Sequence, residues 1–381
     1  MNKEHNQHLT IKYNKFIEGI KKTGFGLEYS ISRILMDNDW TVINNKYYID
    51  DVQGVAREID ILAYKVSIKK NIQIYTVLII SCKKNIENAW ALLAKSKNIK
   101  DPNIDWYPVT VWTNHKIIKL MIDHFDWKKK YISKSKKLLE NLFSSEKHIF
   151  AFQEMSKSTG SPKNDKNIFN SIVSSMKSQN YEIESLKKRK EQDAVYNFNL
   201  ISIVDAPLVR IEYDSDEPTL KTINSDIYIG SYIINKKETI SRVHFINAEH
   251  FPVCLPTYDS LHSHNVDQTF RLYNSYFDNC VKNELKVKLF EQNFNQRIRW
   301  CIYSAFLHLR NDNAPKYSDI HVNIRWDDKK GSIALSINGV YDDEELEFFN
   351  NNEEIKIKIL FSLKHYYQYT GDIYFESYVP F

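Results

Sequence analysis

A nearly continuous apolar run from Ile72 to Cys82 is the feature that most constrains how this chain can fold. Runs of this length and composition are typical of strands that are buried on both faces of a sheet. Lys69-Lys70-Asn71 precedes the run and predicts a hairpin turn, and a second strand-like segment, Glu58 to Ser67, lies before that turn. We therefore expect an antiparallel hairpin at the centre of a mixed α/β domain.

Polar residues stand at the same end of both predicted strands. Arg57-Glu58-Ile59-Asp60 begins the first strand, and Ser81-Cys82-Lys83-Lys84 ends the second. Because side chains alternate across a strand, Ser81 and Lys83 should share one face, and Asp60 should share a face with Glu58, Leu62 and Tyr64. The hairpin can then direct Asp60, Ser81 and Lys83 into one cleft. Burial of such groups is unfavourable by several kcal/mol unless they are paired or bind a metal, which indicates a functional site.

The rest of the pattern predicts helices and strands around this hairpin. Apolar residues between Leu27 and Met36 recur at helical spacing, which places Glu28 on a helix. Short apolar runs between Gly, Pro and Asn clusters predict the other elements. We expect further helices at 8–22, 85–97, 117–127, 167–190, 267–310 and 353–366, and further strands at 40–43, 106–112, within 196–256 and at the C-terminal end.

Charge is distributed unevenly along the sequence. Residues 1–137 contain 24 Lys and Arg against 14 Asp and Glu, whereas the whole chain has a net charge of +4. The first third is therefore basic and the remainder acidic, which favours an N-terminal part that faces a polyanion. A lysine-rich solvated surface accounts for the same asymmetry, so charge alone leaves both interpretations open.

Cysteine usage and hydropathy indicate the class of protein. Cys82, Cys254, Cys280 and Cys301 are far apart and form no CxxC pair, which argues against a disulfide framework or a zinc finger. The N-terminus has no apolar segment of the signal-peptide kind, and no run approaches the roughly 18 apolar residues of a membrane span. We expect a soluble cytoplasmic protein without a membrane partner.

The order of a helix carboxylate, a strand aspartate and a lysine on the next strand resembles the PD-(D/E)XK restriction-endonuclease-like nuclease superfamily. Glu28 matches the helix acid, Asp60 the metal-binding aspartate and Lys83 the lysine, within roughly residues 20–125. Ser81 occupies the position of the second acid, with Cys82 as the variable residue. A Trp shortly after the motif, Trp90, is also similar to nucleases of this class.

The resemblance implies a restriction-endonuclease-like mixed central sheet flanked by helices. It also implies an endonuclease that hydrolyses nucleic acid, with DNA as the expected substrate and Mg²⁺ or Mn²⁺ as the cofactor. Asp60 would bind the ion together with the Cys82 carbonyl and Glu28. Lys83 would orient the attacking water and stabilise negative charge on the phosphate.

Ser81 distinguishes this chain from that pattern, because a hydroxyl is a neutral and weaker ligand than a carboxylate. Metal affinity should therefore be lower. Two acids are candidates to restore the missing charge: Glu58, as a further metal ligand, and Glu87, in the first turn of the helix expected at 85–97. Ser81 also motivates the alternative, a non-catalytic nucleic-acid-binding or assembly module on a degenerate nuclease fold.

Basic residues near the motif are candidates for contacts with nucleic acid. They are Lys84, Arg57, Lys128, Lys129 and Lys130. A solvated helix face explains the three consecutive lysines equally well, and for Arg57 we favour an ion pair with Glu58. His262-Ser-His264 is interpreted as part of a polar loop rather than as a metal site.

The sequence suggests four segments. Residues 1–127 form the expected nuclease domain, 128–195 a charged helical connector, 196–262 a strand-rich segment that can extend the nuclease layer, and 263–381 an α+β C-terminal domain. We expect the last segment to be regulatory, or to bind a protein partner or a second copy of the chain. By analogy alone, such a combination suggests an effector in antiviral host defence.

Overall fold

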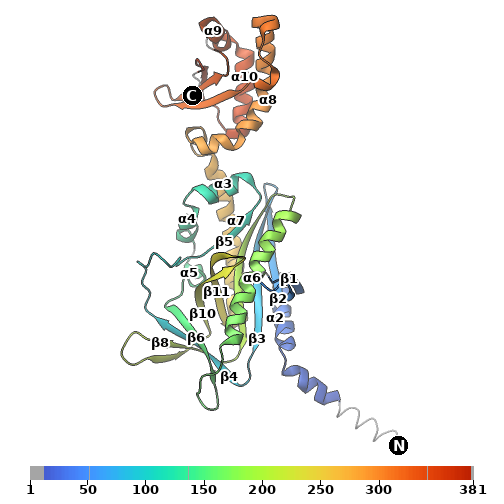
Figure 1. Cartoon of the computed structure of the whole chain (residues 1–381), viewed down its shortest axis with the longest axis vertical. Coiled ribbons are helices and arrows are strands. Elements are labelled where there is room, and N and C mark those ends of the chain that lie inside the picture. The colour runs from blue at the N-terminus through green and yellow to red at the C-terminus, as the bar shows by residue number, and fades with distance from the viewer. Residues whose placement is uncertain (1–12, 51, 136, 341, 379–381) are drawn as a thin grey trace, which may run out of the picture. The chain divides into compact units, whose positions relative to one another are not determined.

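The computed structural model describes residues 13–50, 52–135, 137–340 and 342–378, and it divides into two compact units (Figure 1). Unit 1 consists of residues 1–115 and 126–269, and unit 2 of residues 116–125 and 270–381. This replaces the four expected segments, because the stretch predicted as a connector, 128–195, supplies a strand and a long helix to unit 1. Of the expected helix at 8–22, residues 8–12 lie outside the described part, and residues 13–21 are helical.

Among the described residues, the core of unit 1 is a mixed sheet of seven strands. The predicted hairpin is confirmed, since β2 and β3 pair antiparallel and both Lys70 and Asn71 in their turn have positive φ. β3 also pairs with β7 in parallel, and β7 pairs with β11 in parallel. The order is β1 (Thr41–Ile49), β2 (Ala56–Lys69), β3 (Ile72–Lys84), β7 (Ala194–Asp205), β11 (Lys237–Asn247) and β10 (Ser225–Ile234), with β5 (Thr110–Thr113) beside β7.

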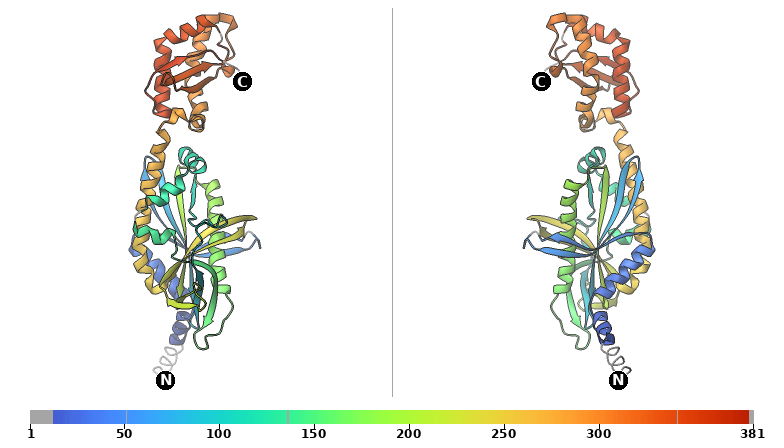
Figure 2. Two further views of the ribbon diagram at one scale, coloured as in Figure 1. Left: turned by 90° about the vertical axis from the view of Figure 1, so that its left-hand side faces the viewer. Right: turned by 90° about the vertical axis from the view of Figure 1, so that its right-hand side faces the viewer.

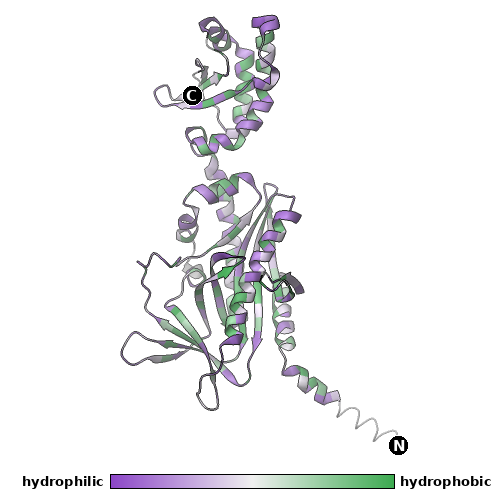
Figure 3. Cartoon of the chain, in the orientation of Figure 1, coloured by the Kyte–Doolittle hydropathy of each residue, from purple (hydrophilic) through white to green (hydrophobic). Residues whose placement is uncertain are grey.

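Helices cover both faces of this sheet, as the two side views in Figure 2 show. α6 (Lys166–Arg189) packs on one face, where Val77 and Ile79 of β3 join its apolar cluster. α2 (Phe25–Asp37) and the first part of α7 (Phe251–Phe277) pack on the other face. β3 is therefore apolar on both faces, as its sequence predicted, and Figure 3 shows hydrophobic colour along the central strands.

The expected helix at 85–97 is wrong, because this segment forms β4 (Asn88–Lys95). β4 lies between β6 and β8 in a second, smaller sheet, and its Ala91 and Leu92 are fully buried. A short apolar run cannot be assigned to helix or strand from its spacing alone, and here strand pairing overrides the helix preference of Ala and Leu. The order of this sheet is β6 (His148–Ser156), β4, β8 (Leu208–Glu212) and β9 (Thr219–Thr222).

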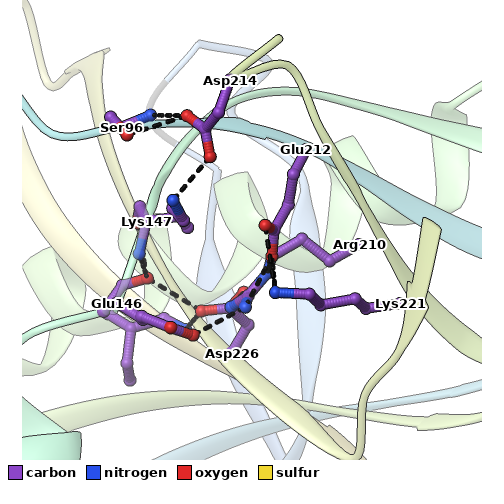
Figure 4. Close-up of polar contacts among 10 residues, drawn as sticks. Ser96, Glu146, Lys147, Arg210, Glu212, Asp214, Lys221 and Asp226 are labelled. Atoms are coloured by element: carbon purple, nitrogen blue, oxygen red, sulfur yellow. Dashed lines mark hydrogen bonds and ion pairs between the residues drawn. The ribbon is translucent and has the colours of Figure 1, made fainter. Parts of the chain in front are cut away.

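A buried ionic network joins the two sheets of unit 1 (Figure 4). Arg210 on β8 donates to Glu212 at 2.9 Å, to Asp226 on β10 at 3.1 Å and to Glu146 at 2.7 Å. The side chains of Arg210, Glu212 and Asp226 are at most 7% exposed. Lys221 on β9 adds a partner to Glu212 from the solvent side. Arg210 is the one buried cation that faces the two buried carboxylates, so its removal leaves Glu212 and Asp226 without a buried countercharge.

Unit 2 is an α+β unit, as predicted for the C-terminal region. Asn279 has a positive φ and the Asn283 side chain accepts from the Lys286 N–H, so the helix expected over 267–310 is two helices, α7 and α8 (Glu284–Arg310). Phe294, Phe306 and Leu335 lie in its core. Its other elements are α3 (Lys116–His124), α9 (Asp343–Asn351), α10 (Glu353–Tyr367), β12 (Val322–Asp327), β13 (Ser332–Ile337) and β14 (Ile373–Phe375).

The remaining elements are short. α4 (Trp127–Ser133) and α5 (Lys137–Phe143) precede β6, and the strand expected at 106–112 is reduced to β5. Across the described ranges, no helix is both long and apolar enough to cross a membrane. Short 3-10 turns lie at Ala248–His250, Cys280–Lys282, Asn311–Asn313 and Tyr317–Asp319.

We predict that Arg210→Met lowers the free energy of unfolding by about 3–5 kcal/mol, because it leaves the buried carboxylates of Glu212 and Asp226 without their cation. Urea denaturation followed by circular dichroism measures this loss. Lys221→Met is the matched control, since Lys221 is 51% exposed and its ion pair should contribute less than about 1 kcal/mol. A loss of about 1 kcal/mol or less for Arg210→Met would show that the network does not hold the sheets together.

Candidate active site

The candidate site lies where β2 and β3 part. Their pairing runs from Lys69 opposite Ile72 to Ile61 opposite Ile80. Beyond that point β2 continues beside β1 only, and β3 continues beside β7 as far as Lys84. We call this point, with Asp60 on one branch and Ser81 to Lys83 on the other, the strand fork.

The Asp60 carboxylate is held in the strand fork by three donors from β3. Its Oδ2 accepts from the Cys82 backbone N–H at 2.7 Å, from the Ser81 hydroxyl at 3.2 Å and from the Lys83 ammonium at 3.2 Å. Lys83 also donates to the Cys82 carbonyl at 3.3 Å. The structure therefore brings Asp60, Ser81 and Lys83 together, and Asp60 and Lys83 stay partly accessible, with 21% and 28% of their side chains exposed.

The predicted alternation of faces does not continue through Asp60. Ile59 and Leu62 both pack into the cluster beneath α6, whereas Ile61 packs on the opposite face. The interruption lies opposite Asn45, whose neighbours pair with Ile59 and Ile61 and whose φ is +55°. Left-handed backbone is tolerated best by Gly and Asn, so Asn45 permits the irregularity that sets Asp60 into the strand fork.

Glu28 reaches the site from α2. Ile31 and Leu35, further along this helix, pack against Ile61 of β2 and fix the helix on the sheet. Burial raises the pKa of the Glu28 carboxyl, the nearby charge of Asp60 raises it further, and the Lys83 ammonium lowers it. Glu28 therefore lies close enough to Asp60 and Lys83 for their charges to act on its carboxyl.

Glu58 is the better placed of the two acids considered as replacements for the missing carboxylate. Its side chain is exposed, accepts a hydrogen bond from the Asn45 amide, and adds to the charge that raises the pKa of Glu28. Glu87 is not in a helix, because the helix expected at 85–97 does not form. Glu87 lies exposed in the bend before β4.

Three of the five candidate basic contacts, Arg57, Lys84 and Lys128, form ion pairs within unit 1. Arg57 pairs with Asp50 at 3.2 Å, so the expected pair with Glu58 is wrong; adjacent strand residues face opposite ways. Lys84 pairs with Asp205 at 3.1 Å, beside the strand fork. Lys128 pairs with Asp105 at 2.5 Å, and Lys129 and Lys130 are exposed on the same helix, α4, which is not part of the strand fork.

Other residues considered from the sequence have structural roles. Trp90 is fully buried and packs edge-on against Phe245. Burial raises the pKa of the Cys82 thiol well above its ordinary value, so its sulfur is not a thiolate at neutral pH. His262 and His264 lie on α7 rather than in the expected loop, and they hydrogen-bond to Thr76 and to the Tyr131 carbonyl, respectively.

Asn45 is the residue of this site that the sequence interpretation missed. The signal was present, because Asn44-Asn45 interrupts an otherwise β-forming segment between Trp40 and Ile49. An Asn pair inside a strand indicates a bulge or a positive φ. For the same reason, the strand predicted at 40–43 is shorter than the observed strand β1, Thr41–Ile49.

The donor set suits a single hard cation held by few protein ligands. Glu28 and Asp60 supply two carboxylates and Cys82 a carbonyl, and Mg²⁺ sites use one or two carboxylates with waters and substrate oxygens. Within the part of the chain that the structure describes, no three or more His, Cys, Asp or Glu side chains are grouped to hold a metal. Burial and then the Asp60 charge raise the pKa of the Glu28 carboxyl, and a cation bound between the two carboxylates would offset both effects.

Comparisons of the chain with known protein families, with curated protein sequences and with solved structures found no match.

We predict that Glu28→Gln stabilises the protein at neutral pH but not in acid. A carboxyl whose pKa is raised in the folded state contributes stability below its unfolded pKa, and that contribution is lost as pH rises through the folded value. The difference in unfolding free energy, variant minus wild type, should therefore increase between about pH 4 and pH 7. Urea titrations at several pH values measure it. A difference that does not change with pH would show that the pKa of Glu28 is not raised in the folded protein.

Proposed function

We propose that unit 1 is a restriction-endonuclease-like domain and that the chain is a metal-dependent endonuclease, with DNA as the favoured substrate. The observation that carries this proposal is the Asp60–Lys83 ion pair of 3.2 Å in the strand fork, with Glu28 near enough to be influenced by both charges. A partly accessible acid–lysine pair at an irregular strand end is difficult to explain as a stabilising element alone.

The residues of the strand fork have complementary roles in phosphodiester hydrolysis. A bound Mg²⁺ or Mn²⁺ would polarise the phosphate and lower the pKa of the attacking water. Asp60, Glu28 and the Cys82 carbonyl would hold that ion. Lys83, which already reaches both the Asp60 carboxylate and the Cys82 carbonyl, would release one of them to orient the water and stabilise the charge that develops on the phosphate.

The charge of the chain supports a polyanionic substrate. The excess of positive charge lies in residues 1–137, which include α2 and the hairpin of the strand fork. Unit 2, with its own core, is proposed as the regulatory or partner-binding part, and a role as a host-defence effector rests on analogy alone.

We predict that Asp60→Ala and Lys83→Ala each lower the rate of plasmid cleavage in Mg²⁺ or Mn²⁺ by about 10²–10³-fold, because each removes a charge aimed at the reacting phosphate. Gel analysis of supercoiled, nicked and linear DNA measures the rate. The controls are Asp123→Ala and Lys119→Ala, which remove the two members of an exposed Asp–Lys pair of 2.7 Å on α3. Cleavage that is unaffected by the two site substitutions would refute the catalytic assignment.

A second function is favoured by one observation. Ser81 donates to Asp60 where an acid would otherwise add charge, and this reduces the acidic ligands available to an ion. The site then resembles a nuclease centre that has lost its metal and kept its fold. In that case unit 1 would bind nucleic acid, or assemble with a partner, without cleaving.

We predict that calorimetry with Mn²⁺ detects a millimolar or tighter site in the wild type, a tighter site in Ser81→Asp and none in Asp60→Ala. The added carboxylate supplies a charged oxygen ligand beside Asp60, and such ligands are the ones that hard divalent ions prefer. Ser81→Thr is the matched control, because it keeps the neutral hydroxyl. Absence of a site in both the wild type and Ser81→Asp would favour the non-catalytic function.

A further inference from the structure

A small cavity lies on the α6 face of the main sheet and is lined by residues of β1, β2, β3, β7 and the C-terminal half of α6. Its volume is about 150 Å³, which is below the roughly 300–1,000 Å³ of sites for drug-sized ligands and is suited to a single ring system. The residues that matter here are the aromatic and charged ones. They are Tyr64, Tyr75, Tyr196, Glu182, Arg189 and Lys46.

Aromatic rings form one side of the cavity. Tyr75 on β3 and Tyr196 on β7 are stacked, with ring centroids 4.2 Å apart and planes 9° from parallel. Tyr64 on β2 meets Tyr75 edge-on, with centroids 5.6 Å apart. These rings are partly buried, so they present aromatic surface to the cavity instead of filling it.

Charged groups form the other side. The Glu182 carboxylate is 4% exposed, and it accepts ion pairs from Lys46 at 2.6 Å and from Arg189 at 2.9 Å. The Lys190 ammonium lies over the Tyr75 ring at 5.1 Å from its centroid. The Glu182 carboxylate is therefore paired with two cations, and the charged residues that line the cavity carry a net positive charge beside its aromatic wall.

We propose that this cavity binds a nucleobase that carries phosphate. The base would stack on the tyrosine rings, the Glu182 carboxylate would accept a base N–H, and the cations would contact the phosphate. A neutral apolar ring would leave the positive charge uncompensated, and a simple phosphate would leave the rings unused. The inference extends the proposed nuclease function, on which its choice of a nucleic-acid ligand rests.

Two sources share this chemistry: a base in a substrate strand and a free nucleotide. Tyr64 is four residues from Asp60 on β2, which is about 13 Å at about 3.3 Å per residue. That length corresponds to about four stacked base steps of about 3.4 Å. A substrate strand bound at the strand fork is therefore one source of the base, and a free nucleotide is the other.

The test is fluorescence anisotropy of the full chain with an end-labelled 12-nucleotide single strand in EDTA, which prevents cleavage. Tyr75→Leu should weaken binding about tenfold, because a stacking surface is lost, and Tyr75→Phe should bind within twofold of the wild type, because the ring is kept. Tyr47→Leu is the matched control, since Tyr47 is exposed on β1 and does not line the cavity. A second experiment measures whether AMP displaces the labelled strand.

Displacement of the strand by AMP in the wild type but not in Tyr75→Leu would support the cavity as a free-nucleotide site. Ring-dependent strand binding without AMP competition would support it as a strand site. Equal binding by Tyr75→Leu and Tyr75→Phe, or no binding by any form, would overturn the proposal. Plasmid cleavage by the same preparations separates the two ideas: ring-dependent binding without cleavage refutes the nuclease alone, and cleavage without ring dependence refutes the cavity alone.

Discussion

The Asp60 carboxylate and the Lys83 ammonium form an ion pair at the place where two neighbouring strands separate, and the proposed chemistry depends on that separation. Paired strands would satisfy the Cys82 N–H with a backbone carbonyl. Here the Asp60 side chain takes that N–H, because β2 and β3 are no longer paired at this point. A backbone donor that would otherwise be orphaned thus fixes the carboxylate, and the same carboxylate fixes the lysine.

The geometry of the strand fork depends in turn on packing that is distant from it. β3 is held in place because α6 covers one face and α2 covers the other, and because β7 pairs with it from Gln73 to Lys84. β2 separates from β3 at this point but remains paired with β1. Asn45 of β1, whose φ is positive, accommodates the irregular backbone. The helix that supports β2 and β3 also carries Glu28. α2 therefore both supports the two strands that form the strand fork and supplies its second carboxylate, Glu28.

Much of this arrangement could be predicted from the sequence, and the failures have physical causes. The β2–β3 hairpin was predictable because a long apolar run, a Lys-Lys-Asn turn and polar strand ends all indicate the same structure. The hairpin placed Asp60 near Ser81 and Lys83, but the backbone irregularity opposite Asn45 that sets Asp60 into the strand fork was not predicted. β4 was mistaken for a helix because its burial comes from β6 and β8, which lie far away in the sequence. The ion pair of Arg57 with Asp50 was not predicted, because folding brings the two residues together and their spacing in the sequence does not indicate the contact.

The central claim, that Glu28 and Asp60 together hold a divalent cation beside Lys83, is tested most directly by crystallography with Mn²⁺. Crystals of the full chain soaked in Mn²⁺ should show an anomalous scattering peak between the two carboxylates and within about 2–2.5 Å of an Asp60 oxygen and the Cys82 carbonyl. The peak should disappear in Asp60→Ala crystals grown and soaked in the same way. No peak at the strand fork in the wild type, or an ion bound only elsewhere in unit 1, would contradict the account.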